Sequence, residues 1–373
     1  MRLFALSALM LCHGLLVACE NKQPISTMSS QVQPTELKRE LNSLRSENEI
    51  PALVLTEFSC DTHEIAYAGV LRVGSNQEIS PAARFNIGSN AKSMLATVAG
   101  RLHEKGRLDL DAPLKDLWPE ASARAPDKSE ITLAQLLSHS SGLPAFDTGV
   151  ALETVPDFTS SSMSVTTDAA LWFLEQPTVS TSGEKAVYSN AGYVVAGAIL
   201  EYVVGQPFDE IIQAELFEPL KLQAAFGEPR KLGTSEPFGH YVYDESIVAY
   251  DSLDPPLPPF LIAAGNVSIS MEDYVTYLQI HLCGLQDQAS SILGFEMVKR
   301  LHKPHIEGGA ALGWGVTELG GEKVSFHIGS TGEFTAYVAI SPQKNRGLAA
   351  LTNIGGTPSE AIQSWLVETV SQP

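Results

Sequence analysis

The chain has 373 residues, of which 44% are hydrophobic and 18% are charged. These fractions are typical of a folded protein with a sizeable core and exclude general disorder. The 24 basic and 43 acidic residues give a formal net charge of −19, so nucleic acid and anionic lipid should repel the protein. The four cysteines are too few for a disulfide scaffold and show no paired spacing for zinc, and we expect neither a metal nor another cofactor.

The amino end is predicted to be an export signal over residues 1–18. Arg2 precedes an apolar run of about 15 residues, which is too short to span a bilayer. The run ends in Leu-Val-Ala-Cys at 16–19, which resembles the lipobox of bacterial lipoproteins, in which the cysteine carries the lipid. We predict lipidation of Cys19; the alternative is an ordinary secretory signal with a chance cysteine.

Residues 19–35 are rich in Ser, Gln and Pro and are predicted to form a flexible tether. The body of the protein would then face the periplasm beside a membrane of the cell envelope without entering it. Glu20, directly after the cysteine, favours the outer membrane if the host is Gram-negative.

The body begins with a predicted helix over 35–49, where leucines recur at helical spacing. Two strands are expected within 51–73, around a turn at Asp61-Thr62. The other expected elements are helices at 89–106, 132–137, 192–204 and 270–282, strands at 323–327, 335–340 and 347–352, and a closing helix at 361–370 behind a capping box at 357–360.

Strands therefore lie at both ends of the body and helices in the middle. The economical solution is an α+β fold, with one antiparallel sheet built from both ends, flanking helices, and an inserted all-helical domain. We place the α/β domain at 36–105 and 261–373 and the helical domain at 106–260.

The candidate chemistry begins at Ser89-x-x-Lys92. Positions three apart share one face of a helix, and a lysine buried against an apolar helix can activate a neighbouring hydroxyl. Ser182-x-x-Lys185 and Ser341-x-x-Lys344 match the same pattern, but only Ser89 opens a long apolar helix directly after a strand-like segment. Ser89 is therefore the predicted nucleophile, against the alternative of a simple helix cap.

Acyl transfer also needs a base near the hydroxyl and donors for the oxyanion. Tyr188, beside the charge of Lys92, can take the Ser89 proton, and Asn190 can hold a substrate amide and orient Lys92. Downstream, His327-Ile328-Gly329 stands at the end of an apolar strand, whose exposed edge can pair with a substrate backbone.

These motifs resemble those of the class C β-lactamase and penicillin-recognising serine hydrolases. That family has Ser-x-x-Lys, Tyr-x-Asn and Lys/His-x-Gly in this order, and here the motifs stand at 89–92, 188–190 and 327–329. The flanking residues at 131–144 and 311–316 are similar as well, and the similarity covers roughly residues 40–370. The resemblance implies the β-lactamase/transpeptidase-like fold.

The resemblance also implies a role for each motif residue. Ser89 would be the nucleophile, and Lys92 and Tyr188 would transfer protons. The backbone N–H groups of Ser89 and Ser330 would form the oxyanion hole. The other substrate-binding residues would be Asn190, His327 and Gly329, with no metal involved.

His327 replaces the lysine that is usual in true β-lactamases of this class, and histidine is mostly neutral at pH 7. We therefore predict a serine hydrolase of amides or esters, with a D-Ala-D-Ala carboxypeptidase or other peptidase, or an esterase, favoured. The alternatives are a true β-lactamase and a penicillin-binding sensor without turnover. The expected partners are a small-molecule, peptide or ester substrate and the membrane lipid, and we expect a monomer.

Cys60 and Cys283 remain once the export signal and the lipidated cysteine are set aside. An oxidising compartment allows a disulfide between them, but two buried thiols are the favoured interpretation. Three other side chains are assigned to structure: His139 to capping rather than to a triad, Trp314 to packing, and His302, like His305, to the surface.

Overall fold

The computed structural model describes residues 34–372 except 148, 159–163 and 252–256. The predicted signal peptide, Cys19 and the tether as far as residue 33 lie outside the described residues. The lipid anchor and the outer-membrane location therefore stay predictions. Within the described ranges, no helix has both the length and the hydrophobicity needed to cross a bilayer.

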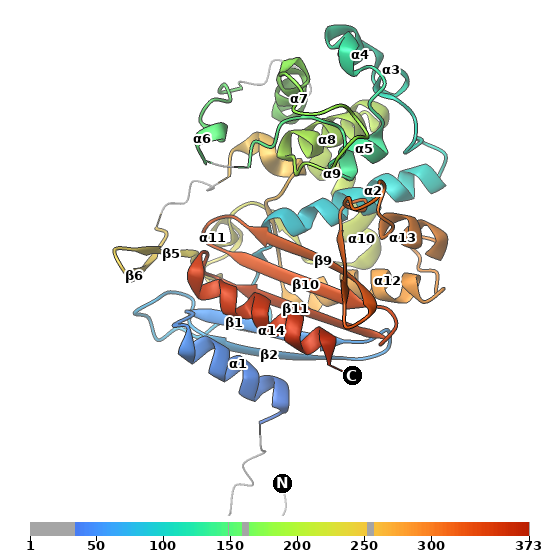
Figure 1. Ribbon diagram of the computed structural model, residues 1–373. Helices are drawn as coiled ribbons and strands as arrows, with labels where there is room; N and C mark the ends of the chain where they lie inside the picture. The colour runs from blue at the N-terminus through green and yellow to red at the C-terminus, as the bar shows by residue number, and fades with distance from the viewer. Residues whose placement is uncertain (1–33, 148, 159–163, 252–256, 373) are drawn as a thin grey trace, which may run out of the picture. The chain divides into compact units, whose positions relative to one another are not determined.

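A six-stranded antiparallel sheet joins the two ends of the body (Figure 1). The early strands pair with the last strand of the chain, so the predicted sheet built from both ends is confirmed, although its edge strand at 315–319 was not foreseen. The strands in spatial order are β2 (His63–Gly69), β1 (Ala52–Phe58), β11 (Arg346–Thr352), β10 (Thr335–Ser341), β9 (Glu322–Ser330) and β8 (Gly315–Leu319).

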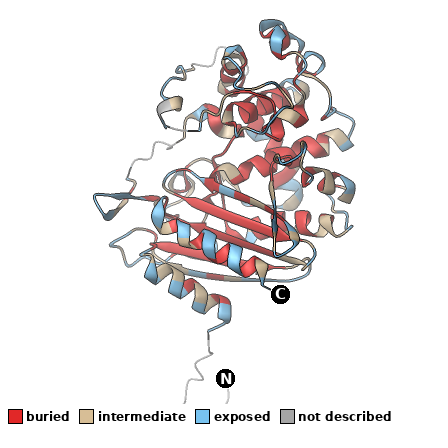
Figure 2. Ribbon diagram, in the orientation of Figure 1, coloured by how far each residue is buried: buried red, intermediate tan, exposed pale blue. Residues whose placement is uncertain are grey.

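Helices cover both faces of the sheet. Successive side chains of each strand point to opposite faces, so they pack into two different cores. On one face, residues such as Leu53 pack with α1 (Glu36–Glu47) and α14 (Glu360–Ser371). On the other face, the core includes α2 (Ala91–Glu104) and α12 (Met271–Leu285). Every residue of β10 is consequently buried (Figure 2), which is why its central residues, 336–340, are apolar without alternation.

The segment inserted after α2 is mostly helical but also contains a hairpin that the sequence analysis did not foresee. Asp244 and Glu245 close this hairpin with φ angles of 48° and 59°, the conformation of a two-residue turn. The division of the chain at residues 105 and 261 stays a prediction. The elements of the segment include α3 (Leu114–Leu117), α4 (Pro119–Arg124), α5 (Leu133–Leu137), α6 (Gly149–Leu152), α7 (Val165–Glu175), α8 (Asn190–Val204), α9 (Phe208–Ile212), α10 (Glu218–Leu220), α11 (Pro229–Leu232), β4 (Ala225–Phe226), β5 (His240–Tyr243) and β6 (Ser246–Ala249).

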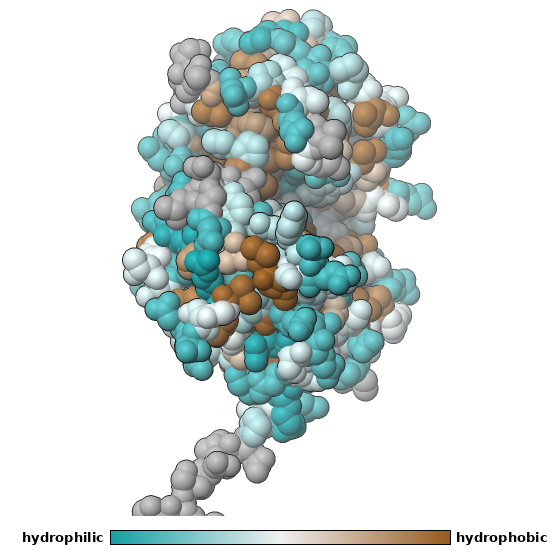
Figure 3. Space-filling model, turned by 90° about the vertical axis from the view of Figure 1, so that its left-hand side faces the viewer, coloured by the Kyte–Doolittle hydropathy of each residue, from teal (hydrophilic) through white to brown (hydrophobic). Residues whose placement is uncertain are grey.

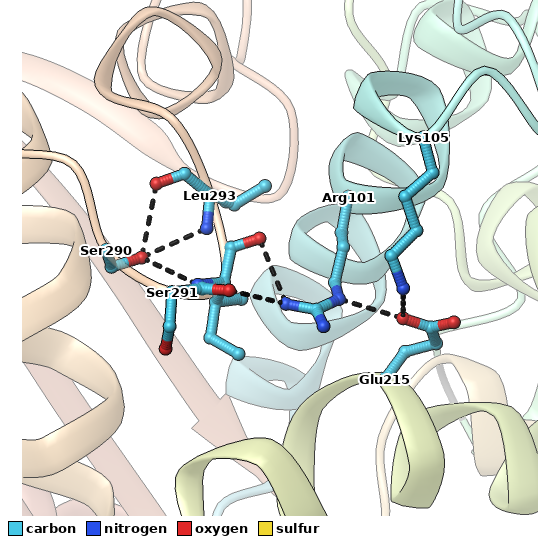
Figure 4. Close-up of polar contacts among 7 residues, drawn as sticks. Arg101, Lys105, Glu215, Ser290, Ser291 and Leu293 are labelled. Carbon is cyan, nitrogen blue, oxygen red and sulfur yellow. Dashed lines mark hydrogen bonds and ion pairs between the residues drawn. The ribbon is translucent and has the colours of Figure 1, made fainter.

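Helix α2 is anchored at its far end by a mostly buried cluster of charges (Figure 4). Arg101 Nε donates to Glu215 Oε2 at 2.8 Å, and Arg101 Nη1 donates to the Ser291 carbonyl at 3.0 Å. Lys105 pairs with the same carboxylate oxygen of Glu215. Because Arg101 and Glu215 each have more than one partner, the cluster holds the far end of the helix that directly follows the predicted nucleophile.

Cys60 and Cys283 are joined in a disulfide, which corrects the expectation of two buried thiols. Cys60 follows β1, Cys283 lies in α12, and their Cα atoms are 5.3 Å apart, within the range that a disulfide needs. The contact between α12 and β1 brings together two residues separated by 223 positions.

The closing helix starts without the capping box predicted at 357–360. Thr357–Ser359 form a single 3-10 turn instead, and Ser359 Oγ donates to the Gly356 carbonyl at 2.7 Å. Because that bond occupies the Ser359 hydroxyl, α14 begins at Glu360 without a side-chain cap.

The face shown in Figure 3 is largely hydrophilic, and apolar side chains gather on it in patches. This distribution agrees with the excess of acidic residues in the sequence.

Candidate active site

Ser89 lies where a short strand, β3 (Phe85–Asn86), turns into α2. Gly88 has a φ of +49° and opens one 3-10 turn before the α-helix. A Cβ added to Gly88 would lie 2.6 Å from the Ser330 nitrogen. The backbone before the serine is therefore pressed against the end of β9, and glycine satisfies both the positive φ and the close approach.

Lys92 is fully buried one helical turn after Ser89. Its Nζ donates to Ser89 Oγ at 3.1 Å and also to the Ala264 carbonyl. Burial lowers the pKa of the Lys92 ammonium, and the neighbouring Tyr188 partly offsets this shift. A lysine in this state releases its proton more readily than a solvated one, so it is suited to proton transfer with Ser89.

Tyr188 completes the cluster, because its hydroxyl donates to Ser89 Oγ at 2.7 Å. Its ring centre lies 4.5 Å from that of His139 and 5.0 Å from Lys92 Nζ. The residue is 38% exposed, so a substrate can reach it. Residues 89, 92 and 188 thus converge on one hydroxyl, as the sequence analysis expected.

Asn190 begins α8, but the structure does not place it as the group that orients Lys92. Its Nδ2 donates to the Phe146 carbonyl at 2.9 Å, and the Ala264 carbonyl holds Lys92 instead. Contact between Asn190 and a substrate stays a prediction. Ala264 was missed because a backbone carbonyl leaves no signal in the sequence.

The end of β9 lies against the nucleophile. Strand β8 pairs with β9 only as far as Phe326, so among the described strands none pairs with residues 327–330 on that edge. A Cβ on Gly329 would lie 2.0 Å from the Ile87 oxygen and 2.9 Å from the Ser89 nitrogen. The amides of Ser89 and Ser330 are thereby brought close together, as two oxyanion donors require.

His327 is buried at this edge of β9, with 9% of its surface exposed. Its Nδ1 lies 3.0 Å from the Ile328 carbonyl oxygen. Burial, followed by the charge of Lys92, lowers the pKa of the His327 imidazole to about 3. The ring is therefore neutral at pH 7 and offers no positive charge to a substrate carboxylate.

His139 and Trp314, both predicted to have structural roles, make defined contacts. His139 Nδ1 accepts the N–H of Ser189 at 3.0 Å, directly before α8, and this bond holds the backbone beside Tyr188. Trp314 is 2% exposed and stacks on His302 with ring centres 4.6 Å apart, so its packing role is confirmed.

The surface assignment of His302 is wrong. The residue is 6% exposed, and its Nε2 is hydrogen-bonded to His281 Nδ1 at 3.0 Å. It directly follows α13 (Phe295–Leu301), whose residues Val298 and Leu301 are buried in the core, and this side of the helix carries His302 inward. His305 is exposed as predicted. Across the described ranges, no three His, Cys, Asp or Glu side chains gather into a potential metal site.

Replacing Gly329 by alanine should lower kcat for an ester substrate by about 10²–10³-fold, because the added methyl displaces the Ser89 amide from the oxyanion site. Initial rates with a chromogenic ester measure this effect, and circular dichroism checks the fold. Gly149→Ala is the matched control, since its added methyl meets no atom within 4 Å. Full activity of folded Gly329→Ala would contradict this placement of the oxyanion site.

A serine hydroxyl bonded to a buried lysine and to a tyrosine, at the start of a helix packed on an antiparallel sheet, defines a serine hydrolase. The chain belongs to the beta-lactamase family, whose model matches residues 60–370. The predicted family and the β-lactamase/transpeptidase-like fold are thereby confirmed.

The similar proteins include penicillin-binding proteins and a β-lactamase. Penicillin-binding protein 4 of Amycolatopsis lactamdurans is 27% identical over 343 residues, 84% of this chain and 84% of that protein. Protein flp of Staphylococcus aureus is 23% identical over 295 residues, 77% of this chain and 56% of that protein.

Two solved structures extend this comparison. The octameric penicillin-binding protein homologue from Pyrococcus abyssi has a TM-score of 0.74 at 25% identity, covering 90% of this chain and 76% of that chain. The class C beta lactamase from Rhodobacter sphaeroides has a TM-score of 0.69 at 21% identity, covering 90% and 99%, and this likeness supports the fold alone.

Proposed function

We propose that this protein hydrolyses esters or amides that have an uncharged leaving group, through an acyl-enzyme on Ser89. Ser89 would attack the carbonyl carbon while the Lys92–Tyr188 pair accepts its proton, and the amides of Ser89 and Ser330 would hold the oxyanion. Tyr188 would then give the proton to the leaving atom, and water would release the acyl group by the same route. Asn190 and Gly329 would contact the substrate.

The main support for this proposal is that the His327 imidazole is uncharged at neutral pH. A β-lactam, or a peptide that ends in D-Ala-D-Ala, presents a carboxylate, which binds best to a fixed cation. With its pKa lowered to about 3, the His327 imidazole supplies no cation at neutral pH. This favours an esterase over both the D-Ala-D-Ala carboxypeptidase and the true β-lactamase.

A D-Ala-D-Ala carboxypeptidase is the second candidate, because a relative that is 27% identical is named a penicillin-binding protein. A sensor without turnover is less well supported. Ser89 contacts both members of a proton-transfer pair, and binding alone needs no such pair.

The test is to incubate the purified full chain with p-nitrophenyl butyrate, with a peptide ending in D-Ala-D-Ala, and with a fluorescent penicillin. We expect the ester to be turned over faster than D-Ala is released, and penicillin to be a poor substrate. Faster release of D-Ala would establish the carboxypeptidase, and rapid loss of the β-lactam would establish the β-lactamase. A stable penicillin adduct without ester turnover would establish the sensor.

The pH dependence offers a separate check on His327. The kcat/KM ratio of an anionic ester to a neutral ester of the same acid should stay flat between about pH 5.5 and 8. With its pKa at about 3, the imidazole is already uncharged at pH 5.5, so raising the pH removes no positive charge. A ratio that falls as the pH rises through about 6.5 would show a charged His327 instead.

We also propose that the protein is exported and carries a lipid on Cys19. The short apolar run that ends in Leu-Val-Ala-Cys supports this. Cell fractionation should find the chain with the membranes and Cys19→Ala in the soluble fraction; equal distribution of the two would contradict the anchor. The outer-membrane location and the monomeric state remain predictions.

A further inference from the structure

A pocket of about 210 Å³ lies beside Tyr188 and the end of β9. Tyr188, whose hydroxyl bonds to Ser89, forms part of its wall, and Trp314 and Phe326 supply apolar surface. Gly315 also lines it, and a Cβ there would lie 2.6 Å from the Phe326 ring, so no side chain at 315 fills the space. The pocket is therefore a mostly apolar space whose wall includes Tyr188, the residue that bonds to the reacting hydroxyl.

His139 supplies this pocket with a hydrogen-bond donor. Because Nδ1 accepts the N–H of Ser189, Nδ1 has no proton, and in the neutral ring the proton is on Nε2. Nε2 has no hydrogen-bond partner among the described residues. It is also not one of the unpartnered side-chain atoms that are fully shielded from solvent. Since the ring lines the pocket, this N–H can meet a molecule that enters it.

His327 supplies the same pocket with an acceptor. A carbonyl oxygen only accepts, so the bond to Ile328 places the proton on Nδ1 and leaves the lone pair on Nε2. This Nε2 likewise has no partner within the described part of the chain and is not enclosed. The two imidazoles that line the pocket thus present one donor and one acceptor without any charge.

The reaction geometry assigns the pocket to the leaving group. The general acid must reach the leaving atom, so the leaving group has to lie on the side of Tyr188. The oxyanion lies instead between the amides of Ser89 and Ser330, further along the edge of β9. Of Ser89, Lys92 and Tyr188, only Tyr188 is in the wall of the pocket that His139 and His327 line, so a group that leaves on the side of Tyr188 is directed toward this pocket.

We propose that this pocket is the leaving-group subsite, and that His139 Nε2–H and His327 Nε2 form an uncharged donor–acceptor pair that selects a neutral leaving group bearing a hydroxyl or a carboxamide. This inference rests on the proposed function. A hydroxyl or carboxamide both donates and accepts, so it can pair with both rings. An alkyl group leaves both nitrogens unpaired, and a carboxylate presents no donor to the His327 lone pair.

The test compares three butyrate esters that differ only in the leaving alcohol: carbamoylmethyl, propyl and carboxymethyl butyrate. For the full chain we expect kcat/KM to be about tenfold higher for the carbamoylmethyl ester than for the propyl ester. The carboxymethyl ester should be slower than the carbamoylmethyl ester. His327→Phe should bring the carbamoylmethyl-to-propyl ratio close to one.

Two further variants keep the comparison interpretable. His327→Gln retains an acceptor and should restore much of the ratio, whereas His305→Phe, at an exposed position, should leave it unchanged. Turnover of the three esters without preference would contradict the leaving-group subsite but not the proposed hydrolase activity. A ratio that survives in folded His327→Phe would also contradict the subsite. Absence of turnover for every ester would overturn the proposed function and this inference together.

Discussion

Replacing Ser89 by alanine should lower kcat/KM for p-nitrophenyl butyrate by about 10⁴-fold or more, because no other group can carry the acyl intermediate. The hydroxyl is the atom to which Lys92 and Tyr188 both donate. Its removal also leaves the Lys92 ammonium with one hydrogen-bond partner fewer. Steady-state rates measure the loss of kcat/KM, and mass spectrometry of the trapped acyl-enzyme measures the loss of the acyl intermediate.

Ser182→Ala is the matched control for this variant. Ser182 belongs to another Ser-x-x-Lys match, and its hydroxyl donates to Gln135 Oε1 at 2.8 Å rather than to a lysine. This variant should keep wild-type activity and acylation. An acyl group found on Ser182, or undiminished turnover by Ser89→Ala, would move the nucleophile away from α2.

Replacing Tyr188 by phenylalanine should lower kcat by about 10²–10⁴-fold, the range of a general acid–base group. The substitution keeps the ring beside His139 and Lys92 and removes only the hydroxyl that bonds to Ser89. Because the ring stays, the free energy of unfolding should change little. Steady-state kinetics and urea denaturation separate the two effects.

Tyr202→Phe serves as the comparison, since Tyr202 is also 38% exposed and lies in the same helix, α8. Its ring packs on that of Trp118, with ring centres 5.9 Å apart, rather than beside Ser89, and kcat should not change. If Tyr188→Phe lost stability rather than turnover, Tyr188 would be a packing residue and Lys92 would have to act alone.

The order of the three motifs was enough to predict which residues meet, and the structure brings Ser89, Lys92 and Tyr188 together. Local patterns also predicted several of the helices, because the apolar residues of α2 recur at helical spacing and α8 is a nearly all-apolar run. The strands β10 and β11 were found for a similar reason, since each is an apolar run with polar residues only at its ends.

The remaining features depend on contacts between distant segments, which a single sequence does not encode locally. The Ala264 carbonyl that holds Lys92 is a backbone atom, and the disulfide depends on α12 packing against β1. His302 was misplaced because its burial depends on its neighbours His281 and Trp314. The neutral state of His327 likewise follows from burial, which its sequence neighbours do not reveal.

Of the five imidazoles buried in the described ranges, four have strongly lowered pKa values and carry no charge, and this lowers the stability of the fold in acid. Burial lowers the pKa of His139, His281 and His327 to about 3, and that of His302 well below its ordinary value. Each ring takes up a proton near pH 6.5 only once the chain unfolds, so below that pH the free energy of unfolding falls by about 1.4 kcal/mol per pH unit for each ring. Above pH 6.5 the four rings contribute no such dependence. Mild acidification would therefore act on this hydrolase as a denaturant well before it altered the charge of His327.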